Sequence, residues 1–186
     1  MFFDTETTGL PTRIGYDGYY PPEKTDKYDT SRVVELAYLV ADSDTKKVTK
    51  KFQAIIKPNG EYTTDATAKF HGISTKKAEN EGRNRDEVLD EFCKDIELID
   101  TIVGHNVNFD YHIVASELLR SGRPNYLALK DRVCTMNKGK SVMRVSKSPK
   151  LVELYKYLFN KSIDGVHTAM GDTNATMECY FKMIND

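Results

Sequence analysis

Branched apolar residues form short runs near the start of the chain. Residues 32–42 (RVVELAYLVAD) and residues 46–58 (KKVTKKFQAIIKP) have the composition of β-strands, and a Pro-Asn-Gly turn ends the second. Residues 1–4 (MFFD) predict a third, very short strand. We expect these three segments to pair as an antiparallel meander. Residues 11–31, rich in Pro, Gly and Tyr, predict a long irregular loop after the first strand.

Further along, apolar residues recur at helical spacing. Val88, Phe92, Ile96 and Ile99 form one stripe, which predicts a helix within residues 84–100. Similar patterns predict helices within residues 63–73, 74–82, 107–122, 148–160 and 168–184. Two brief apolar runs between the helices, residues 101–106 and 131–136, predict strands.

This order of elements favours an α/β fold with a mixed sheet, because strands alternate with helices after the meander. Sheets of this kind place ligands at the carboxyl ends of their strands. If the first strand ends at Asp4, this acid lies at such an end.

Composition narrows the class of protein but does not decide its function. The 186 residues favour one domain, and 39% hydrophobic with 30% charged residues suits a globular protein rather than a disordered or membrane one. There is no basic, apolar leader at the N-terminus, and the three cysteines show no metal-ligand spacing, so we expect a cytoplasmic protein with reduced thiols. The net charge of −1 argues against binding nucleic acid through an overall positive surface.

The first stretch with candidate chemistry is FFDTETTGL, residues 2–10. Asp4 and Glu6 are two residues apart, so both carboxylates point to one face of an extended segment. Two such anions repel unless a cation neutralises them, and hard oxygen ligands suit Mg²⁺ or Mn²⁺. The alternative is that one of the acids caps a turn beside Thr7 and Thr8.

Two later stretches contain further candidates. In VGHNVNFD, residues 103–110, a predicted strand leads into a helix that carries Asp110, an acid that could instead only stabilise the helix N-terminus. In VHTAMGDT, residues 166–173, His167 precedes a helix and Asp172 lies inside it. Imidazole titrates near neutral pH and can take a proton from water beside a metal, although a lone histidine is more often an ordinary surface or core residue.

Taken together, Asp4, Glu6, Asp110, His167 and Asp172 resemble the DEDDh branch of the 3′–5′ exonucleases. The resemblance covers nearly the whole chain, with FDTETTGL, GHNVNFD and HTAMGDT as the three motifs in order. The sister branch has tyrosine four residues before the last aspartate, where this chain has Thr168. The resemblance implies a ribonuclease-H-like fold over residues 1–186, with a mixed five-stranded sheet and helices on both faces.

The resemblance also implies two-metal hydrolysis of phosphodiester bonds, with two divalent ions, Mg²⁺ or Mn²⁺, as cofactors. Asp4 would bridge the ions, Glu6 and Asp172 would hold the first, and Asp110 would support the second. His167 would be the general base, and nucleoside monophosphates would be released one at a time.

The implied substrate is nucleic acid with a free 3′ end, single-stranded or frayed. The family likeness assigns contacts with the terminal nucleotide to Thr7, Leu10, Phe70, His71, Ile73, Asn106 and Phe109. Ile73 and Phe109 could equally be core residues. The likeness of the first motif to polymerase-associated members favours DNA and raises a polymerase as a candidate partner.

Several alternatives remain open. RNA trimming shares the same motifs, and a non-catalytic binding module could use the same fold. A run that contains no acid over residues 132–152 could guide phosphates or be ordinary solvated surface. Its basic members are Arg132, Lys138, Lys140, Arg144, Lys147 and Lys150.

Overall fold

A computed structural model describes residues 1–16 and 18–185. The strands are β1 (Phe2–Thr7), β2 (Arg13–Ile14), β3 (Gly18–Tyr19), β4 (Val33–Ala41), β5 (Val48–Ile55), β6 (Thr101–Gly104) and β7 (Asp131–Cys134). The α-helices are α1 (Asp65–His71), α2 (Thr75–Glu81), α3 (Arg85–Glu97), α4 (Val107–Arg120), α5 (Thr135–Val142), α6 (Leu151–Phe159) and α7 (Ala169–Asn185). Two 3₁₀ turns, η1 (Thr25–Tyr28) and η2 (Tyr126–Leu129), complete the chain.

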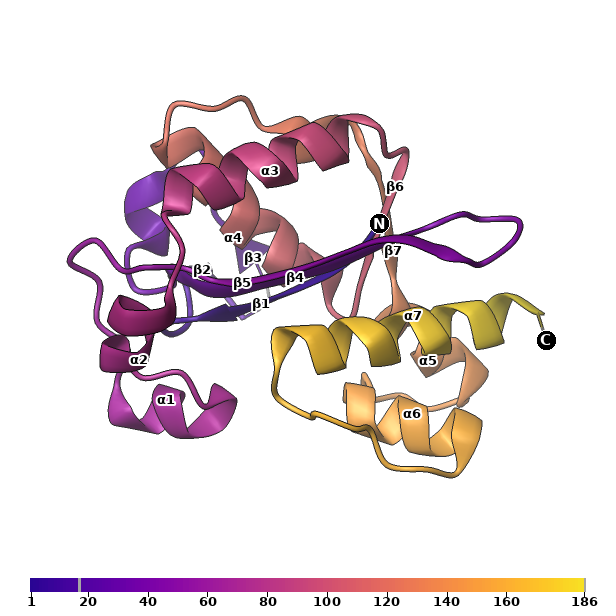
Figure 1. Cartoon of the computed structure of the whole chain (residues 1–186). Coiled ribbons are helices and arrows are strands. Elements are labelled where there is room, and N and C mark those ends of the chain that lie inside the picture. The colour runs from indigo at the N-terminus through magenta and orange to yellow at the C-terminus, as the bar shows by residue number, and fades with distance from the viewer. Residues whose placement is uncertain (17, 186) are drawn as a thin grey trace.

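Five strands form the central sheet, in the order β5-β4-β1-β6-β7. The pairs β5–β4 and β4–β1 are antiparallel, whereas β6 is parallel to both β1 and β7. Helices α3 and α4 cover one face of this sheet and α7 covers the other (Figure 1). The predicted α/β class, the meander and the mixed five-stranded sheet with helices on both faces are confirmed.

The first strand is longer than the sequence pattern predicts. It runs from Phe2 to Thr7 instead of ending at Asp4, and it pairs with β4 over its whole length. Two further hydrogen bonds join the start of the chain to β6. The N–H of Val103 donates to the carbonyl oxygen of Met1, and the N-terminal ammonium of Met1 donates to the carbonyl oxygen of Thr101, both at 2.8 Å. Asp4 therefore lies inside the central strand of the sheet and not at its carboxyl end.

Other boundaries also differ from expectation. Residues 11–31 are not wholly irregular, since β2 and β3 pair as a small hairpin and η1 follows. Helix α5 and turn η2 had no counterpart in the predicted pattern. The apolar content of α5 is low, which explains why periodicity did not reveal it.

The aromatic residues at the start of β1 divide between two cores. Phe3 packs toward Phe92 of α3, with ring centroids 6.5 Å apart, in the core beneath α3 and α4. Phe2 points to the opposite face, where its ring lies 5.4 Å from those of Tyr180 and Phe181 in α7. This alternation fixes which face each later β1 side chain occupies.

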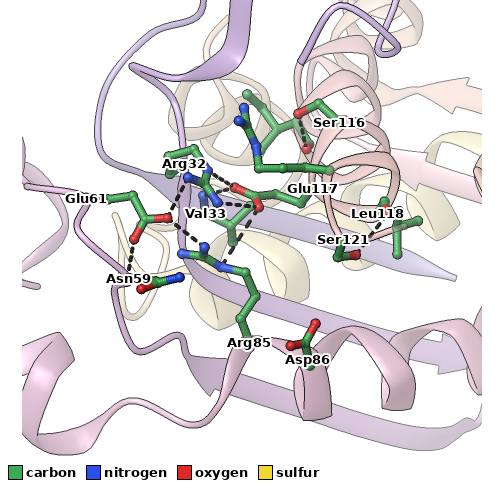
Figure 2. A network of polar contacts seen from close by, with 12 residues as sticks. Arg32, Val33, Asn59, Glu61, Arg85, Asp86, Ser116, Glu117, Leu118 and Ser121 are labelled. Atoms are coloured by element: carbon green, nitrogen blue, oxygen red, sulfur yellow. Dashed lines mark hydrogen bonds and ion pairs between the residues drawn. The ribbon is translucent and has the colours of Figure 1, made fainter. Parts of the chain in front are cut away.

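A network of ion pairs fastens the chain segment before α1 to the sheet and to two helices (Figure 2). Arg32, the residue before β4, contacts Glu61 and Glu117, each at 2.6 Å. Arg85 of α3 also contacts Glu61 at 2.6 Å. These side chains are largely buried, and they hold the entrance to α1 in place relative to α4. Among the described residues, no helix is both long and apolar enough to span a bilayer.

Candidate active site

The alternation of β1 places two acids on the face covered by α7. Asp4 and Glu6 follow Phe2 at steps of two residues and share its side of the sheet, whereas Thr5 shares the side of Phe3. In the strand pairing, Asp4 lies opposite Ala37 and Glu6 opposite Glu35. Neither acid caps a turn, because both lie within the strand.

The third acid of this face, Asp172, comes from the first turn of α7. Oxygen atoms of Asp4, Glu6 and Asp172 lie within 4.8 Å of one another. Close packing of the preceding loop makes this possible: a Cβ at Gly171 would lie 2.1 Å from the carbonyl oxygen of Gly165. Only glycine fits at position 171, so the loop that carries His167 packs directly against the helix that carries Asp172.

The fourth acid, Asp110, reaches the site from α4 on the other face of the sheet. Its Oδ1 accepts hydrogen bonds from the backbone N–H of Thr5 at 3.0 Å and from the Thr5 hydroxyl at 2.8 Å. Asn106, in the left-handed conformation with φ 69°, turns the chain from β6 into α4. Asparagine tolerates this conformation better than most residues, which suits it to that corner.

His167 lies at the rim of the site, exposed to solvent. Its backbone also has a positive φ, 63°, in the loop before α7. The Phe70 ring of α1 packs against the imidazole, with centroids 4.1 Å apart and planes tilted by 39°. The structure thus brings all five sequence-predicted acid and histidine residues to one cleft.

Burial and mutual repulsion make these carboxyl groups hard to ionise in the absence of a cation. Burial, followed by the charges of Asp110 and Asp172, raises the pKa of Asp4 well above its usual value. Burial and Asp172 raise the pKa of Glu6 to about 8. Burial raises the pKa of Asp110 to about 7, although its hydrogen bonds from Thr5 act in the opposite direction. No lysine or arginine in the described ranges pairs with these acids.

The acids line an open cleft of about 820 Å³. Six of the seven residues predicted to contact the substrate line it: Thr7, Leu10, Phe70, His71, Asn106 and Phe109. Leu10 and Phe70 are 72% and 60% exposed to solvent, so both offer apolar surface to a ligand in the cleft. The Nδ1 of His71 accepts a hydrogen bond from the N–H of Ile73 at 3.2 Å, which fixes the orientation of its ring.

Ile73 is the exception. Its side chain is 2% exposed and packs with Val34 and Ala78 in a small core of its own, so it does not line the cleft. The residue that follows an αL glycine cap at Gly72 points inward, as is common where a hydrophobic contact completes a helix end. The core alternative considered for Ile73 is the one the structure supports.

The sequence analysis considered residues 132–152 only as a basic run, either to guide phosphates or as solvated surface, and did not predict that parts of this run form another wall of the cleft. This wall contains Met136 of α5 and the segment Ser148–Leu151. His105 connects it to the sheet: its ring nitrogens lie 3.1 Å from the Thr135 hydroxyl and 3.0 Å from the Pro149 carbonyl oxygen. His105 was the residue in the sequence that could have indicated this wall, but its partner Pro149 lies 44 residues further along the chain.

The fold and the acidic cleft define a ribonuclease-H-like nuclease domain. A family model described as Exonuclease, of the RNase T type, matches residues 1–180. The chain therefore belongs to this family of DEDDh-type 3′–5′ exonucleases. A search of curated proteins by sequence gave no match.

Similar solved structures include E. coli exonuclease I in complex with a dT13 oligonucleotide, with 18% identity and a TM-score of 0.75. The complex of E. coli exonuclease I with dA16 has 19% identity and a TM-score of 0.73, and a zinc-bound complex with single-stranded DNA has 19% and 0.75. Each alignment covers 99% of this chain but 40% of the exonuclease I chain. At this identity the likeness establishes the fold, and this chain spans about 40% of the length of those proteins.

Proposed function

We propose that the protein is a metal-dependent 3′–5′ exonuclease that removes nucleoside 5′-monophosphates from the 3′ end of nucleic acid. One observation carries this proposal: oxygen atoms of Asp4, Glu6 and Asp172 converge within 4.8 Å in a cleft that also contains Asp110 and His167. Family membership supports the reaction class.

The residues fit a site for divalent cations. The donors are carboxylate oxygens, which Mg²⁺ and Mn²⁺ prefer. Burial raises the pKa values of Glu6 and Asp110, and neither acid forms an ion pair with a basic side chain of the described residues, so a bound cation would stabilise their ionised forms. In the proposed site, Glu6 and Asp172 would hold one ion together with Asp4, and Asp110, also with Asp4, would support a second.

The bound ions would supply Lewis-acid stabilisation of the charge that develops on the phosphate. His167 acts as the general base and removes a proton from the attacking water at an imidazole nitrogen. The water oxygen forms a bond to phosphorus and the P–O3′ bond breaks, which leaves a 3′-hydroxyl on the shortened strand after proton uptake. Phe70 limits the orientations of the imidazole through its ring contact.

The terminal nucleotide is proposed to lie between α1 and the start of α4. Leu10, Phe70 and Phe109 offer apolar surface to a base, which suits stacking that tolerates any sequence. Thr7, His71 and Asn106 offer polar groups to the sugar and phosphate. We favour DNA as substrate, because the first motif is similar to that of polymerase-associated members and the exonuclease I structures hold DNA oligonucleotides.

Activity tests the metal site and the general base separately. Purified protein with Mg²⁺ is expected to release monophosphates from a 3′-labelled oligonucleotide, and chelation is expected to stop the reaction. Asp4→Asn should abolish release, and His167→Ala should lower kcat by about 10²- to 10⁴-fold. Asp90→Asn, on the outer surface of α3, is the matched control and should retain wild-type turnover. Wild-type rates in Asp4→Asn or His167→Ala would refute the assigned roles.

A comparison of three substrates tests the choice of nucleic acid. Single-stranded DNA, duplex DNA and RNA of one sequence are supplied with the same 3′ label. Fastest release from single-stranded DNA is expected. Faster release from RNA would replace the DNA proposal with RNA trimming, and binding of any strand without cleavage would indicate a non-catalytic module.

A further inference from the structure

The hairpin of β2 and β3 is attached to the start of α4 by a continuous stack of rings and guanidinium groups. The guanidinium carbon of Arg13 lies 4.1 Å from the centroid of the Tyr19 ring. The same ring is parallel to the imidazole of His112, with centroids 4.6 Å apart and planes 13° apart. Two groups this close to one ring must occupy opposite faces of it, so Tyr19 is enclosed between Arg13 and His112.

The stack continues along α4 to the edge of the sheet. The rings of His112 and Tyr111 meet edge to face, with centroids 4.9 Å apart. Tyr111 also contacts Arg132 of β7, whose guanidinium carbon lies 4.3 Å from the Tyr111 ring centroid. Residues from three separate parts of the chain therefore form one surface, which we call the arginine ladder: Arg13, Tyr19, His112, Tyr111 and Arg132.

The two arginines of the ladder are held in place but not neutralised. Neither forms an ion pair with a carboxylate among the described residues, and Arg132 donates a side-chain hydrogen bond only to the amide oxygen of Asn108 within this part of the chain, at 3.4 Å. Other arginines of the chain differ in this respect. Arg32, Arg85 and Arg123 each contact one or more acids. A guanidinium has five N–H donors, so one that lies over a ring can still donate to phosphate oxygens.

The position of the ladder relative to the cleft indicates what reaches it. Phe109 lines the cleft, and His112 follows it by three residues on α4, about one turn of helix. The side chains of Asn106, which also lines the cleft, and of Arg13 lie near the Tyr19 hydroxyl and both act to lower its pKa, against the larger effect of burial. The ladder thus begins where the cleft ends, on the side of α4.

We propose that the arginine ladder binds the phosphodiester backbone of the substrate strand one or more nucleotides upstream of the 3′-terminal residue. This inference rests on the proposed nuclease function and assigns a role to the Tyr-rich segment after the first motif. Because both faces of Tyr19 are covered, its ring is not available to stack with a base. The contacts are therefore to phosphates and independent of sequence.

The proposal distinguishes Arg132 from the lysines that follow it. Lys138 and Lys140 are exposed on α5, and neither lies over an aromatic ring of the described residues. Their long side chains lose entropy when a ligand orders them. The two ladder arginines have fewer orientations to lose, because their ring contacts already fix them. A phosphate contact is therefore expected to depend more on Arg13 and Arg132 than on those lysines.

The test measures binding and turnover as functions of oligonucleotide length and salt. Affinity for fluorescent dT8 is measured by anisotropy in an Asp4→Asn background, which prevents cleavage. Arg13→Gln and Arg132→Gln should each weaken binding about threefold to tenfold, and each should reduce the slope of log affinity against log salt by about 0.7. In the cleaving protein, the KM of dT8 should rise more than that of dT2, which is too short to reach the ladder.

Two further sets of variants separate the ladder from general effects of charge or folding. Arg83→Gln removes an arginine that also lies over a ring, that of Phe52 at 5.5 Å, but away from the cleft, and should leave affinity and slope unchanged. Tyr19→Phe keeps the ring beneath Arg13, whereas Tyr19→Leu removes it. The phenylalanine variant should bind dT8 far better than the leucine variant.

An unchanged salt slope in the Arg13→Gln, Arg132→Gln double variant, with thermal unfolding as in the parent, would overturn the proposal. Failure of the proposed function gives a different result: no monophosphate would be released from dT2 or dT8 by the protein with all its acids intact. In that case the slope measured in the binding assay would still report on the ladder.

Discussion

The carboxylate of Glu35 accepts a hydrogen bond at 3.0 Å from the backbone N–H of Ala169, the first residue of α7. Its other oxygen accepts from the amide of Gln53 at 2.9 Å. Glu35 is 4% exposed and lies opposite Glu6 in the pairing of β4 with β1. A buried acid is thus kept beside the acidic cluster, where it fixes the helix that supplies Asp172.

Glu35→Ala is expected to disturb the position of α7. It leaves the buried N–H of Ala169 without an acceptor, which costs about 1–3 kcal/mol in the free energy of unfolding. It should also raise the Mg²⁺ concentration needed for half-maximal activity, because Asp172 is no longer fixed relative to Asp4. Glu35→Gln keeps an acceptor of the same shape and should restore most of both losses. Denaturant unfolding and a Mg²⁺ titration measure these effects. Equal losses in both variants would show that the charge matters and not the hydrogen bond.

The raised pKa values predict how the stability of the metal-free protein varies with pH. Folding raises the pKa of Glu6 from 4.5 to about 8, so the folded state binds the proton more tightly than the unfolded chain. This contribution to stability is complete below pH 4.5 and is lost as the pH rises through 8. Asp110, with a pKa raised to about 7, acts in the same direction.

We therefore expect the chelated protein to lose on the order of 1 kcal/mol of unfolding free energy between pH 6.5 and 8. This window lies above the range in which buried His71 and His105, whose pKa values burial lowers, would become protonated. Glu6→Gln should flatten the slope, and Mg²⁺ should stabilise the protein more at pH 8 than at pH 6.5. Denaturant unfolding at several pH values provides the measurement, and a Mg²⁺ effect independent of pH would contradict the expectation.

Thr5→Val tests the link between the two faces of β1. The substitution keeps the shape of the side chain but removes the hydroxyl that donates to Asp110 at 2.8 Å, while the backbone N–H still donates. Since this hydrogen bond favours the ionised acid, the pKa of Asp110 should rise further. We expect the pH–rate profile to shift toward higher pH and the half-saturating Mg²⁺ concentration to rise about tenfold. Thr5→Ser, which keeps the hydroxyl, should behave like the wild type.

The sequence predicted the fold well where its pattern depends on local chemistry. The apolar stripe of Val88, Phe92 and Ile96 indicated a helix that is present as α3. The end of β1 was predicted incorrectly, because Asp4 and Glu6 look like turn residues when the sheet around them is unknown. Placing two acids in a central strand costs free energy, and the pairing of β1 with β4 offsets this cost. That pairing and the site that the acids form are properties of the tertiary structure.

The candidate site divides in the same way. The spacing of two between Asp4 and Glu6 was sufficient to place them on one face, and the motif order supplied Asp110, His167 and Asp172. The support of these residues could not be read from the sequence. Glu35 accepts a hydrogen bond from the N–H of Ala169, 134 residues away in the sequence, and the ladder joins residues 13, 112 and 132. Such pairs depend on the sheet order, which periodicity does not reveal.

The contact between Phe70 and His167 predicts a graded effect on catalysis. Phe70→Ala removes the ring that packs against the imidazole at 4.1 Å but leaves the proposed base in place. We expect kcat to fall by about tenfold, well short of the loss in His167→Ala. Phe70→Tyr should keep most of the activity. Steady-state kinetics on a labelled oligonucleotide would show this order, and a Phe70→Ala variant as inactive as His167→Ala would mean that the ring does more than orient the base.

The ion-pair network on the far side of α4 predicts a loss of stability without a loss of chemistry. Glu117 is 2% exposed, and its oxygens accept from Arg32 at 2.6 and 3.0 Å and from the N–H of Val33 at 3.3 Å (Figure 2). Glu117→Ala leaves a largely buried guanidinium with Glu61 as its main partner, which should cost about 3–5 kcal/mol of unfolding free energy.

Because the residues that line the cleft do not include Glu117, kcat per folded molecule should stay near the wild-type value. Glu87→Ala removes an exposed acid that lines the same surface pocket as Glu117, outside the catalytic cleft, and serves as the control, with a change within about 0.5 kcal/mol. Unfolding curves combined with active-site titration separate the two quantities. A fall in kcat with unchanged stability would contradict this expectation. It would show that the ion-pair network acts on the catalytic cleft through the segment before α1, and not on the stability of the fold.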